Sequence, residues 1–197
     1  VGSEMCIRDR FNVSYKCLGG FVCTNLSVRF YPNFSQVVPF ATQIPVNISI
    51  YVPKNIPAGD YEGIVAAVSS LTNDTVLVKV KVPINLTWEQ SPSQLEKSVA
   101  QGEEGSLGTI TLTNVGNVKV LLNVSVEGNI SQVLEELPEQ VWIKIGRTEK
   151  IEINFTLPEV HEYTVYSGKL ITRNYTPESG LQEKETALLL EVHPLFV

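Results

Sequence analysis

The chain has 197 residues, of which 43% are hydrophobic and 18% are charged, and its formal net charge is −6. This balance predicts a folded protein with a real core and argues against binding to nucleic acid or to anionic lipid, because both require clustered lysine and arginine. The longest apolar runs fall short of the roughly eighteen residues that a membrane helix needs, so we expect no membrane insertion. No signal peptide is recognisable, and for an exported protein it would have been cleaved or would lie outside this sequence.

Residues 1–10 differ in character from the rest of the chain. They hold the only methionine and one of the three cysteines, and they resemble a translated sequencing-adapter peptide that recurs at the ends of environmental reading frames. We therefore expect an artefact in place of the natural N-terminal sequence. The alternative is an ordinary polar strand, in which Met5 and Ile7 alternate with polar residues.

Cys17 and Cys23 flank a short segment that contains two glycines. Glycine permits a tight reversal, so the two thiols can meet and form a disulfide in an oxidising compartment. A metal site is disfavoured because the chain has no second cysteine pair and both histidines, His161 and His193, lie far away in sequence. We expect no metal and no other cofactor.

Two segments of the chain repeat at an offset of 105 residues. Ile48–Pro53 matches Ile153–Pro158, and a tyrosine and a glycine follow each segment at the same distance. These are Tyr61 and Gly63 in the first copy, and Tyr166 and Gly168 in the second. Each copy has the pattern of a strand, a loop broken by proline, and another strand, which predicts two related units in tandem.

Alternation of apolar and polar residues predicts short strands through most of the chain, with one helical turn at Gln132–Glu136. The predicted strands include Val76–Leu86, Gln94–Val99, Leu107–Thr113, Val118–Val126, Val141–Ile145 and Lys150–Leu157. Units of about 100 residues built from such strands are typical of immunoglobulin-like sandwiches. The sequence therefore predicts an all-β protein of two tandem immunoglobulin-like β-sandwich domains, residues 1–88 and 89–197.

The first domain is expected to lack its initial strand. Subtracting the offset of 105 from Gln94–Val99 places the corresponding segment before residue 1. Either the reading frame is truncated, or a neighbouring subunit supplies the strand, as in donor-strand fibres. Pro194–Val197 is too short to be the donor, so the natural N-terminal segment is the better candidate.

Ten of the thirteen asparagines are followed two residues later by serine or threonine, with no proline between them. With 15 serines and 14 threonines in the chain, chance would give about two such pairs. The pairs predict N-linked glycans, and the alternative is that they merely line the wet faces of strands. The predicted sites are Asn12, Asn25, Asn33, Asn47, Asn73, Asn85, Asn123, Asn129, Asn154 and Asn174.

Three segments carry a resemblance to a known group of proteins: the Thr113–Asn117 turn, Val52–Gly63, and its echo Leu157–Gly168. With these features the chain resembles the tandem immunoglobulin-like domains, of the cell-adhesion-related type, found in prokaryotic and especially archaeal surface and filament proteins. The resemblance covers both units. It implies the fold and an extracellular location at the cell surface, and it names no specific partner.

The sequence shows no nucleophile elbow, phosphate loop, zinc spacing or dinucleotide fingerprint, so we expect no enzymatic activity. Gly102–Ser106 lacks the lysine of a phosphate loop and carries two carboxylates. Trp88 and Trp142 are candidates for stacking on sugars, although such residues more often fill a core or a seam between domains.

These patterns together predict a structural subunit of a heavily N-glycosylated extracellular filament or surface lattice, which associates with copies of itself. An adhesin or a carbohydrate-binding stalk module of a larger surface protein is the main alternative, with contacts to glycans or to a cell surface. A second alternative is an accessory domain pair of a secreted hydrolase.

Overall fold

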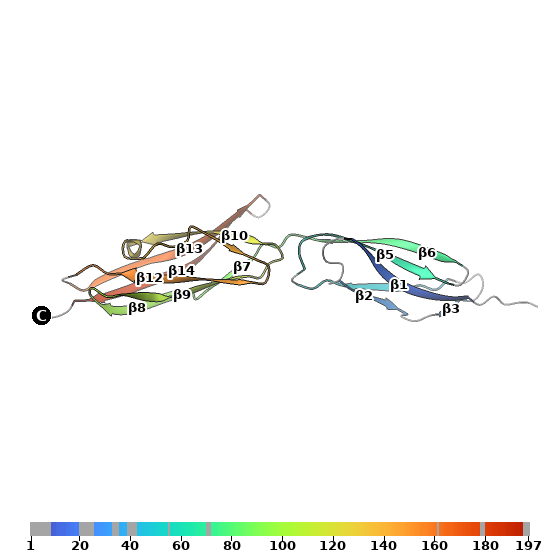
Figure 1. The fold of residues 1–197 in the computed structure, drawn as a ribbon, viewed down its shortest axis with the longest axis horizontal. Helices are drawn as coiled ribbons and strands as arrows, with labels where there is room; N and C mark the ends of the chain where they lie inside the picture. The colour runs from blue at the N-terminus through green and yellow to red at the C-terminus, as the bar shows by residue number, and fades with distance from the viewer. Residues whose placement is uncertain are drawn as a thin grey trace, which may run out of the picture. The chain divides into compact units, whose positions relative to one another are not determined.

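The computed structural model describes residues 9–19, 26–32, 36–38, 43–54, 56–69, 72–160, 162–177 and 180–194 (Figure 1). The regular structure of the described residues is almost entirely β-strand, and the chain divides into two compact units, residues 1–84 and 85–197. Each unit holds two sheets. The predicted fold class, all-β with tandem immunoglobulin-like sandwiches, is confirmed.

The second unit contains eight strands and one short 3-10 helix. They are β7 (Trp88–Ser91), β8 (Gln94–Ala100), β9 (Glu104–Asn114), β10 (Val120–Gly128), η2 (Asn129–Gln132), β11 (Gln140–Ile143), β12 (Thr148–Thr156), β13 (Thr164–Thr176) and β14 (Gly180–His193). One sheet has the order β11-β10-β13-β14-β8 and the other the order β12-β9-β7. Strand β8 runs parallel to β14, and the other pairs are antiparallel. This is the strand order of an immunoglobulin-like sandwich.

The helical turn that the described residues of this unit form differs from the expected one. Instead of Gln132–Glu136, the helix covers Asn129–Gln132, and the chain then runs extended, with Leu134 bridged to Phe155 of β12. Ile130, the buried residue of the helix, anchors it on the core, and this tertiary contact decides where the turn forms.

The core of the second unit is filled by the inward residues of both sheets. Alternation along β12 shows this directly, since Ile151, Ile153 and Phe155 are buried and the residues beside them are exposed or half-buried. Gly168 lets β13 approach β10 closely, because a Cβ at this position would lie 2.0 Å from the carbonyl oxygen of Glu127.

Trp88 lies in this core and belongs to the second unit, not to the end of the first as the predicted boundary at residue 88 had it. Its side chain is 1% exposed, and its residue pairs with Asn114 of β9. The indole Nε1 donates to Thr172 Oγ1 at 3.0 Å, and this hydroxyl donates to Oε1 of Gln90. The chain divides after Ile84, so that Trp88 and the core in which it is buried belong to the same unit.

The turn between β9 and β10 is held together by the side chain of Asn114, which is 1% exposed. Its Nδ2 donates to the carbonyl oxygens of Val118 at 2.8 Å and Ile143 at 3.0 Å. Its Oδ1 accepts from the backbone N–H of Gly116 at 2.9 Å. One amide group therefore satisfies three backbone groups of this turn. The position two residues later is Gly116, where the Cβ of a serine or threonine would clash with the backbone of Asn85.

We expect Asn114→Ala to lower the free energy of unfolding of the second unit by about 2 kcal/mol or more, because it leaves buried backbone groups without partners. Asn114→Asp should cost a similar amount, since a carboxylate cannot donate to the two carbonyls. Tryptophan fluorescence during urea unfolding measures this unit alone, because both tryptophans lie within residues 85–197. An Asn123→Ala control, at an exposed position, should change the value by less than about 0.5 kcal/mol.

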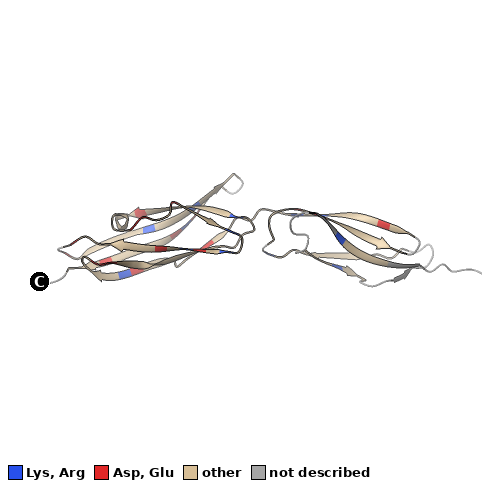
Figure 2. Cartoon of the chain, in the orientation of Figure 1, with Lys and Arg blue, Asp and Glu red and all other residues tan. Residues whose placement is uncertain are grey.

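Ion pairs cover part of the outer face of the larger sheet. Lys169 bonds to Glu185 at 2.6 Å, and Arg173 bonds to Glu183 at 3.1 Å and Glu127 at 3.2 Å. The hydrogen bond that Lys169 donates to Glu185 raises the pKa of Lys169, and those that Arg173 donates to Glu183 and Glu127 raise the pKa of Arg173. Elsewhere, acidic and basic residues are interspersed along the strands (Figure 2).

The described residues of the first unit form six strands: β1 (Asp9–Gly19), β2 (Ser27–Tyr31), β3 (Gln36–Val38), β4 (Asn47–Tyr51), β5 (Gly59–Val68) and β6 (Asn73–Val82). Its sheets have the orders β3-β1-β5-β6 and β2-β4. Strands β4, β5 and β6 correspond to β12, β13 and β14, as the repeat predicted. Among the described residues its buried cluster is small: Leu26, Ile56, Tyr61 and Val82.

Candidate glycosylation sites and exposed surfaces

Eight of the ten predicted glycosylation sites lie among the described residues, and Asn25 and Asn33 lie outside them. Six are exposed and two are half-buried. The exposed sites are Asn12, Asn47, Asn73, Asn85, Asn123 and Asn129, and the half-buried sites are Asn154 and Asn174. The sites occur on both units, on strands and beside them.

Asn85 and Asn123 present the side-chain nitrogen to which a glycan is attached. In Asn85 the oxygen Oδ1 accepts from Thr87 Oγ1 at 2.8 Å, and in Asn123 it accepts from Gln140 Nε2 at 3.0 Å. Both Nδ2 atoms are without a hydrogen-bond partner in the part of the chain that the structure describes. The backbone of Asn85 is also fixed, since its N–H donates to Asn117 Oδ1 at 2.7 Å. These two sites combine exposure with a free attachment atom.

Asn129 and Asn174 use the same nitrogen for internal hydrogen bonds. Nδ2 of Asn174 donates to the carbonyl oxygen of Leu121 at 2.7 Å, and Nδ2 of Asn129 donates to that of Val165 at 3.2 Å. Oδ1 of Asn129 also accepts from the backbone N–H of Ser167 at 2.7 Å. A glycan at either site would have to replace a structural bond, so the ten sequence motifs are not equivalent.

The predicted disulfide lies outside what the structure describes, because Cys23 falls in an undescribed segment. Within the described ranges no group of three or more histidine, cysteine or acidic residues is placed to hold a metal ion. Over the same ranges, no helix is both long and apolar enough to cross a membrane.

The two candidate sugar-stacking tryptophans have opposite environments. Trp88 is buried in the core, so its ring is not available to a ligand, and the core alternative holds for it. Trp142 on the edge strand β11 is 52% exposed. Lys119 Nζ lies 3.9 Å from the centroid of the Trp142 ring, which is close enough for a cation–π contact.

The surface has shallow hollows in both units. One in the first unit has a volume of about 390 Å³, and one beside Trp142 has a volume of about 320 Å³. The second is lined by Trp142, Lys119, Lys144, Arg147, Thr148 and Glu149. In the predicted strand Val141–Ile145, Trp142 and Lys144 lie two residues apart and therefore on one face. Lys119 reaches the hollow from the segment before β10 through the register of β10 with β11, and Arg147 reaches it from the turn before β12.

In the described part of the first unit, the edge of β6 is open where the corresponding edge of β14 in the second unit is paired. In the second unit β14 pairs with β13 and β8, and β12 pairs with β9. In the described part of the first unit β6 pairs with β5 alone and β4 with β2 alone. The offset places the counterpart of β9 on residues that lie outside the described ranges, and that of β8 before residue 1.

Corresponding core positions differ greatly in exposure between the two units. Ile48 is 40% exposed, whereas its counterpart Ile153 is completely buried. The pairs Tyr61–Val80 and Tyr166–Leu190 align β6 with β14, so that Val76 corresponds to Thr186. Val76 is 61% exposed and Thr186 is 0% exposed. Thr186 is covered because its hydroxyl bonds to Pro92 O and Gln90 Nε2, in the segment that forms β7 and β8.

No protein-family model and no curated protein matches the chain. Among solved structures, human CDH23 EC21-23 matches with a TM-score of 0.45 and 14% identity over 92% of this chain and 58% of that one. PapD-like domain 7 of human CEP192 matches with a TM-score of 0.44 and 12% identity, over 55% of this chain and 87% of that one. Domains 4 and 5 of the S-layer protein SbsC match with a TM-score of 0.35 and 17% identity, over 88% of this chain and 74% of that one. The assignment to immunoglobulin-like sandwiches stands on the chain's own strand order.

Proposed function

We propose that this chain is a structural module of an extracellular surface protein, and that it forms the repeating subunit of a filament or lattice coated with N-linked glycans. The observation that carries the proposal is the open face of the first unit, where the edge of β6 is unpaired among the described residues and the side chains of Ile48 and Val76 are exposed. Exposed apolar side chains beside an unpaired strand edge favour pairing with another strand.

The second unit supplies the template for how this face is completed. A strand from a neighbouring subunit would lie parallel to β6, as β8 lies along β14. It would cover Val76 as the segment before β8 covers Thr186. Such a strand contributes both a hydrogen-bond ladder and core side chains, so one segment joins two subunits firmly. Glycans on exposed strands would shield the remaining surface.

The test is cryo-electron microscopy of the protein from its source. The proposal expects a polymer in which a strand of another subunit lies along β6, with sugar density on exposed asparagines. Isolated particles in which β6 is unpaired, or paired with a strand of the same polypeptide, would contradict assembly by strand donation.

A matched pair of variants on β6 tests the same joint. Val76→Asp should abolish the polymer in cells, lowering the affinity of the joint at least a hundredfold, because it places an unpaired carboxylate under the added strand. Leu77→Asp makes the same change of charge on the opposite face of β6, at a position that is 50% exposed, and should leave assembly intact. Equal effects of the two substitutions would contradict the proposed joint.

Glycan occupancy is expected to differ between sites. Mass spectrometry of glycopeptides from the native protein should find Asn85 and Asn123 almost fully occupied, since each combines exposure with an unbonded Nδ2. Asn174 should be mostly unmodified, because its half-buried Nδ2 bonds to Leu121 O. Full occupancy at Asn174 would show that the internal bond does not limit modification, and absence of sugar at every site would remove the glycan coat from the proposal.

A further inference from the structure

Four apolar side chains form a row across the outer face of the larger sheet of the second unit. Trp142 of β11 pairs with Leu121 of β10, and Tyr175 of β13 pairs with Leu181 of β14. Because Asn123 pairs with Arg173, the residues two positions away, Leu121 and Tyr175, lie on the same face as that pair. We call these four side chains the apolar row: Leu121, Trp142, Tyr175 and Leu181.

The apolar row is open to solvent. Trp142, Tyr175 and Leu181 are 52%, 71% and 60% exposed, and Leu121 is half-buried. The row crosses four neighbouring strands, a width of about 14 Å at ~4.8 Å per strand. A flat row of this kind accommodates an extended ligand, whereas a small molecule usually needs a deeper cavity. Large exposed apolar side chains gathered on one face of a soluble unit mark a contact site.

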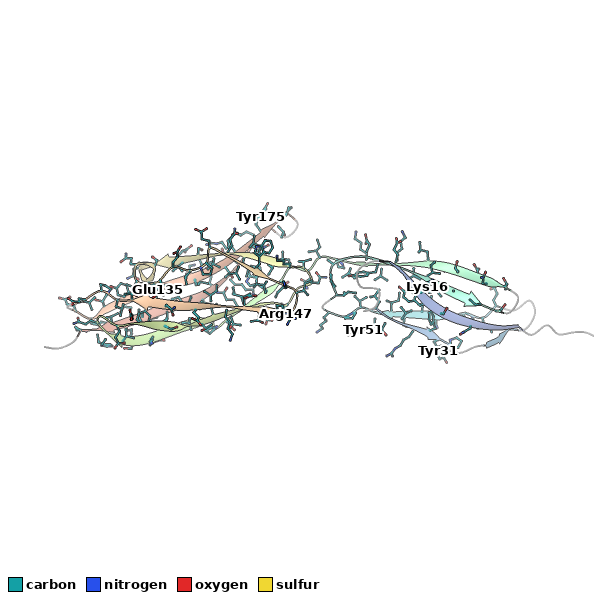
Figure 3. All side chains as sticks on the ribbon, viewed as in Figure 1. Lys16, Tyr31, Tyr51, Glu135, Arg147 and Tyr175 are labelled. Carbon is teal, nitrogen blue, oxygen red and sulfur yellow. The ribbon has the colours of Figure 1, made fainter. Side chains whose placement is uncertain are left out.

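Cations gather at the Trp142 end of the row. Lys119, Lys144 and Arg147 line the hollow of about 320 Å³ beside the indole ring, with a single carboxylate, that of Glu149. Figure 3 shows the side chain of Arg147 at the same end of the second unit as Tyr175. With three basic side chains and one acidic side chain, the hollow carries a local positive charge, whereas the whole chain has a net charge of −6. This local excess of positive charge favours an anionic ligand.

Aromatic rings and cations on one flat surface match the chemistry of an acidic polysaccharide. The apolar face of a pyranose ring stacks on an indole, and carboxylate or sulfate groups accept hydrogen bonds from lysine and from the planar guanidinium of arginine. Nucleic acid would present the same anionic character, but it needs a wider positive surface than three residues in a protein of net negative charge. A purely apolar partner would leave the cations unpaired.

We propose that the outer face of the second unit binds an acidic polysaccharide, with a sugar ring stacked on Trp142, the chain continuing along the apolar row, and its acidic groups paired with Lys144 and Arg147. This contact is independent of how the first unit is completed. It would attach the surface module to an anionic glycan in its surroundings.

The test uses the full chain produced without N-glycans, because Asn123 lies on the same face next to the row. Binding is measured by titration with dextran sulfate and polygalacturonate, each against its uncharged counterpart, dextran and methyl-esterified polygalacturonate. We expect at least one acidic polymer to bind at least tenfold more tightly than its neutral counterpart, with the affinity falling as salt is added. The emission of Trp142 should change on binding, while that of buried Trp88 should not.

Variants separate this site from general attraction of charge. Trp142→Ala and Lys144→Gln should each weaken binding about tenfold, whereas Lys150→Gln on the exposed face of β12 should leave it unchanged. Circular dichroism checks that each variant is folded. Failure of both acidic polymers to bind, equal binding of charged and neutral polymers, or equal effects of Lys144→Gln and Lys150→Gln would overturn the proposal.

Discussion

A Trp88→Ala variant is expected to lose about 3–5 kcal/mol of the free energy of unfolding of the second unit. The indole is 1% exposed, so its removal leaves a large cavity in the core. It also removes the Nε1 donor to Thr172 Oγ1 at 3.0 Å, a hydroxyl that itself bonds to Gln90. Urea unfolding followed by far-ultraviolet circular dichroism measures the change without relying on the deleted fluorophore.

Trp142→Ala is the control for this experiment, because it removes the same side chain from a position that is 52% exposed. Its cost should stay below about 1.5 kcal/mol, since the contacts it loses are the cation–π contact with Lys119 and the cross-strand pair with Leu121. Trp88→Phe should fall between the two, since it retains most of the buried ring and loses the hydrogen bond. Similar losses for Trp88→Ala and Trp142→Ala would contradict the assignment of one tryptophan to the core and the other to the surface.

The second large effect compares two isoleucines at corresponding positions of the repeat. Ile153→Ala should destabilise the second unit by about 2–5 kcal/mol, since Ile153 is completely buried. Ile48→Ala in the isolated chain should cost the first unit less than about 1 kcal/mol, because Ile48 is already 40% exposed. Hydrogen exchange with mass spectrometry resolves the two units in one experiment.

The comparison becomes more informative in the assembled material. Completing the first sandwich would bury Ile48 as Ile153 is buried, so the cost of Ile48→Ala should rise toward that of Ile153→Ala in the polymer. A cost that is unchanged between isolated and assembled protein would show that the face with Ile48 is not covered during assembly.

The repeat and the alternation of residues were sufficient to predict most of the strands. The alternation is a local periodicity that marks individual strands. The repeat, through its matched Tyr-x-Gly positions, places β5 and β13 at corresponding points of the two units. The helical turn was misplaced because Ile130 anchors it through a tertiary contact that no local pattern shows. The boundary was placed after Trp88 for the same reason, since only packing shows which unit buries that ring.

The surface sites were less predictable than the fold. The motif alone gave ten equivalent asparagines, whereas the hydrogen bonds of Asn85 and Asn174 differ in which side-chain atom they use. Alternation in the predicted strand Val141–Ile145 is sufficient to place Lys144 on the face of Trp142, because the two residues lie two positions apart. The contact of Lys119 with that ring depends on the register between β10 and β11, which distant segments determine together.

The parallel pairing of β8 with β14 determines how the second unit responds to being pulled from both sides. Gln94 at the start of β8 pairs with Ala187, and Ala100 at its end pairs with His193, so the chain enters and leaves at opposite ends of this ladder. Tension between neighbours would slide the two strands along each other, and all their hydrogen bonds would bear the load at once. An antiparallel pair of these strands would open one bond at a time. A load applied at these two ends would therefore be resisted by the whole β8–β14 ladder in shear.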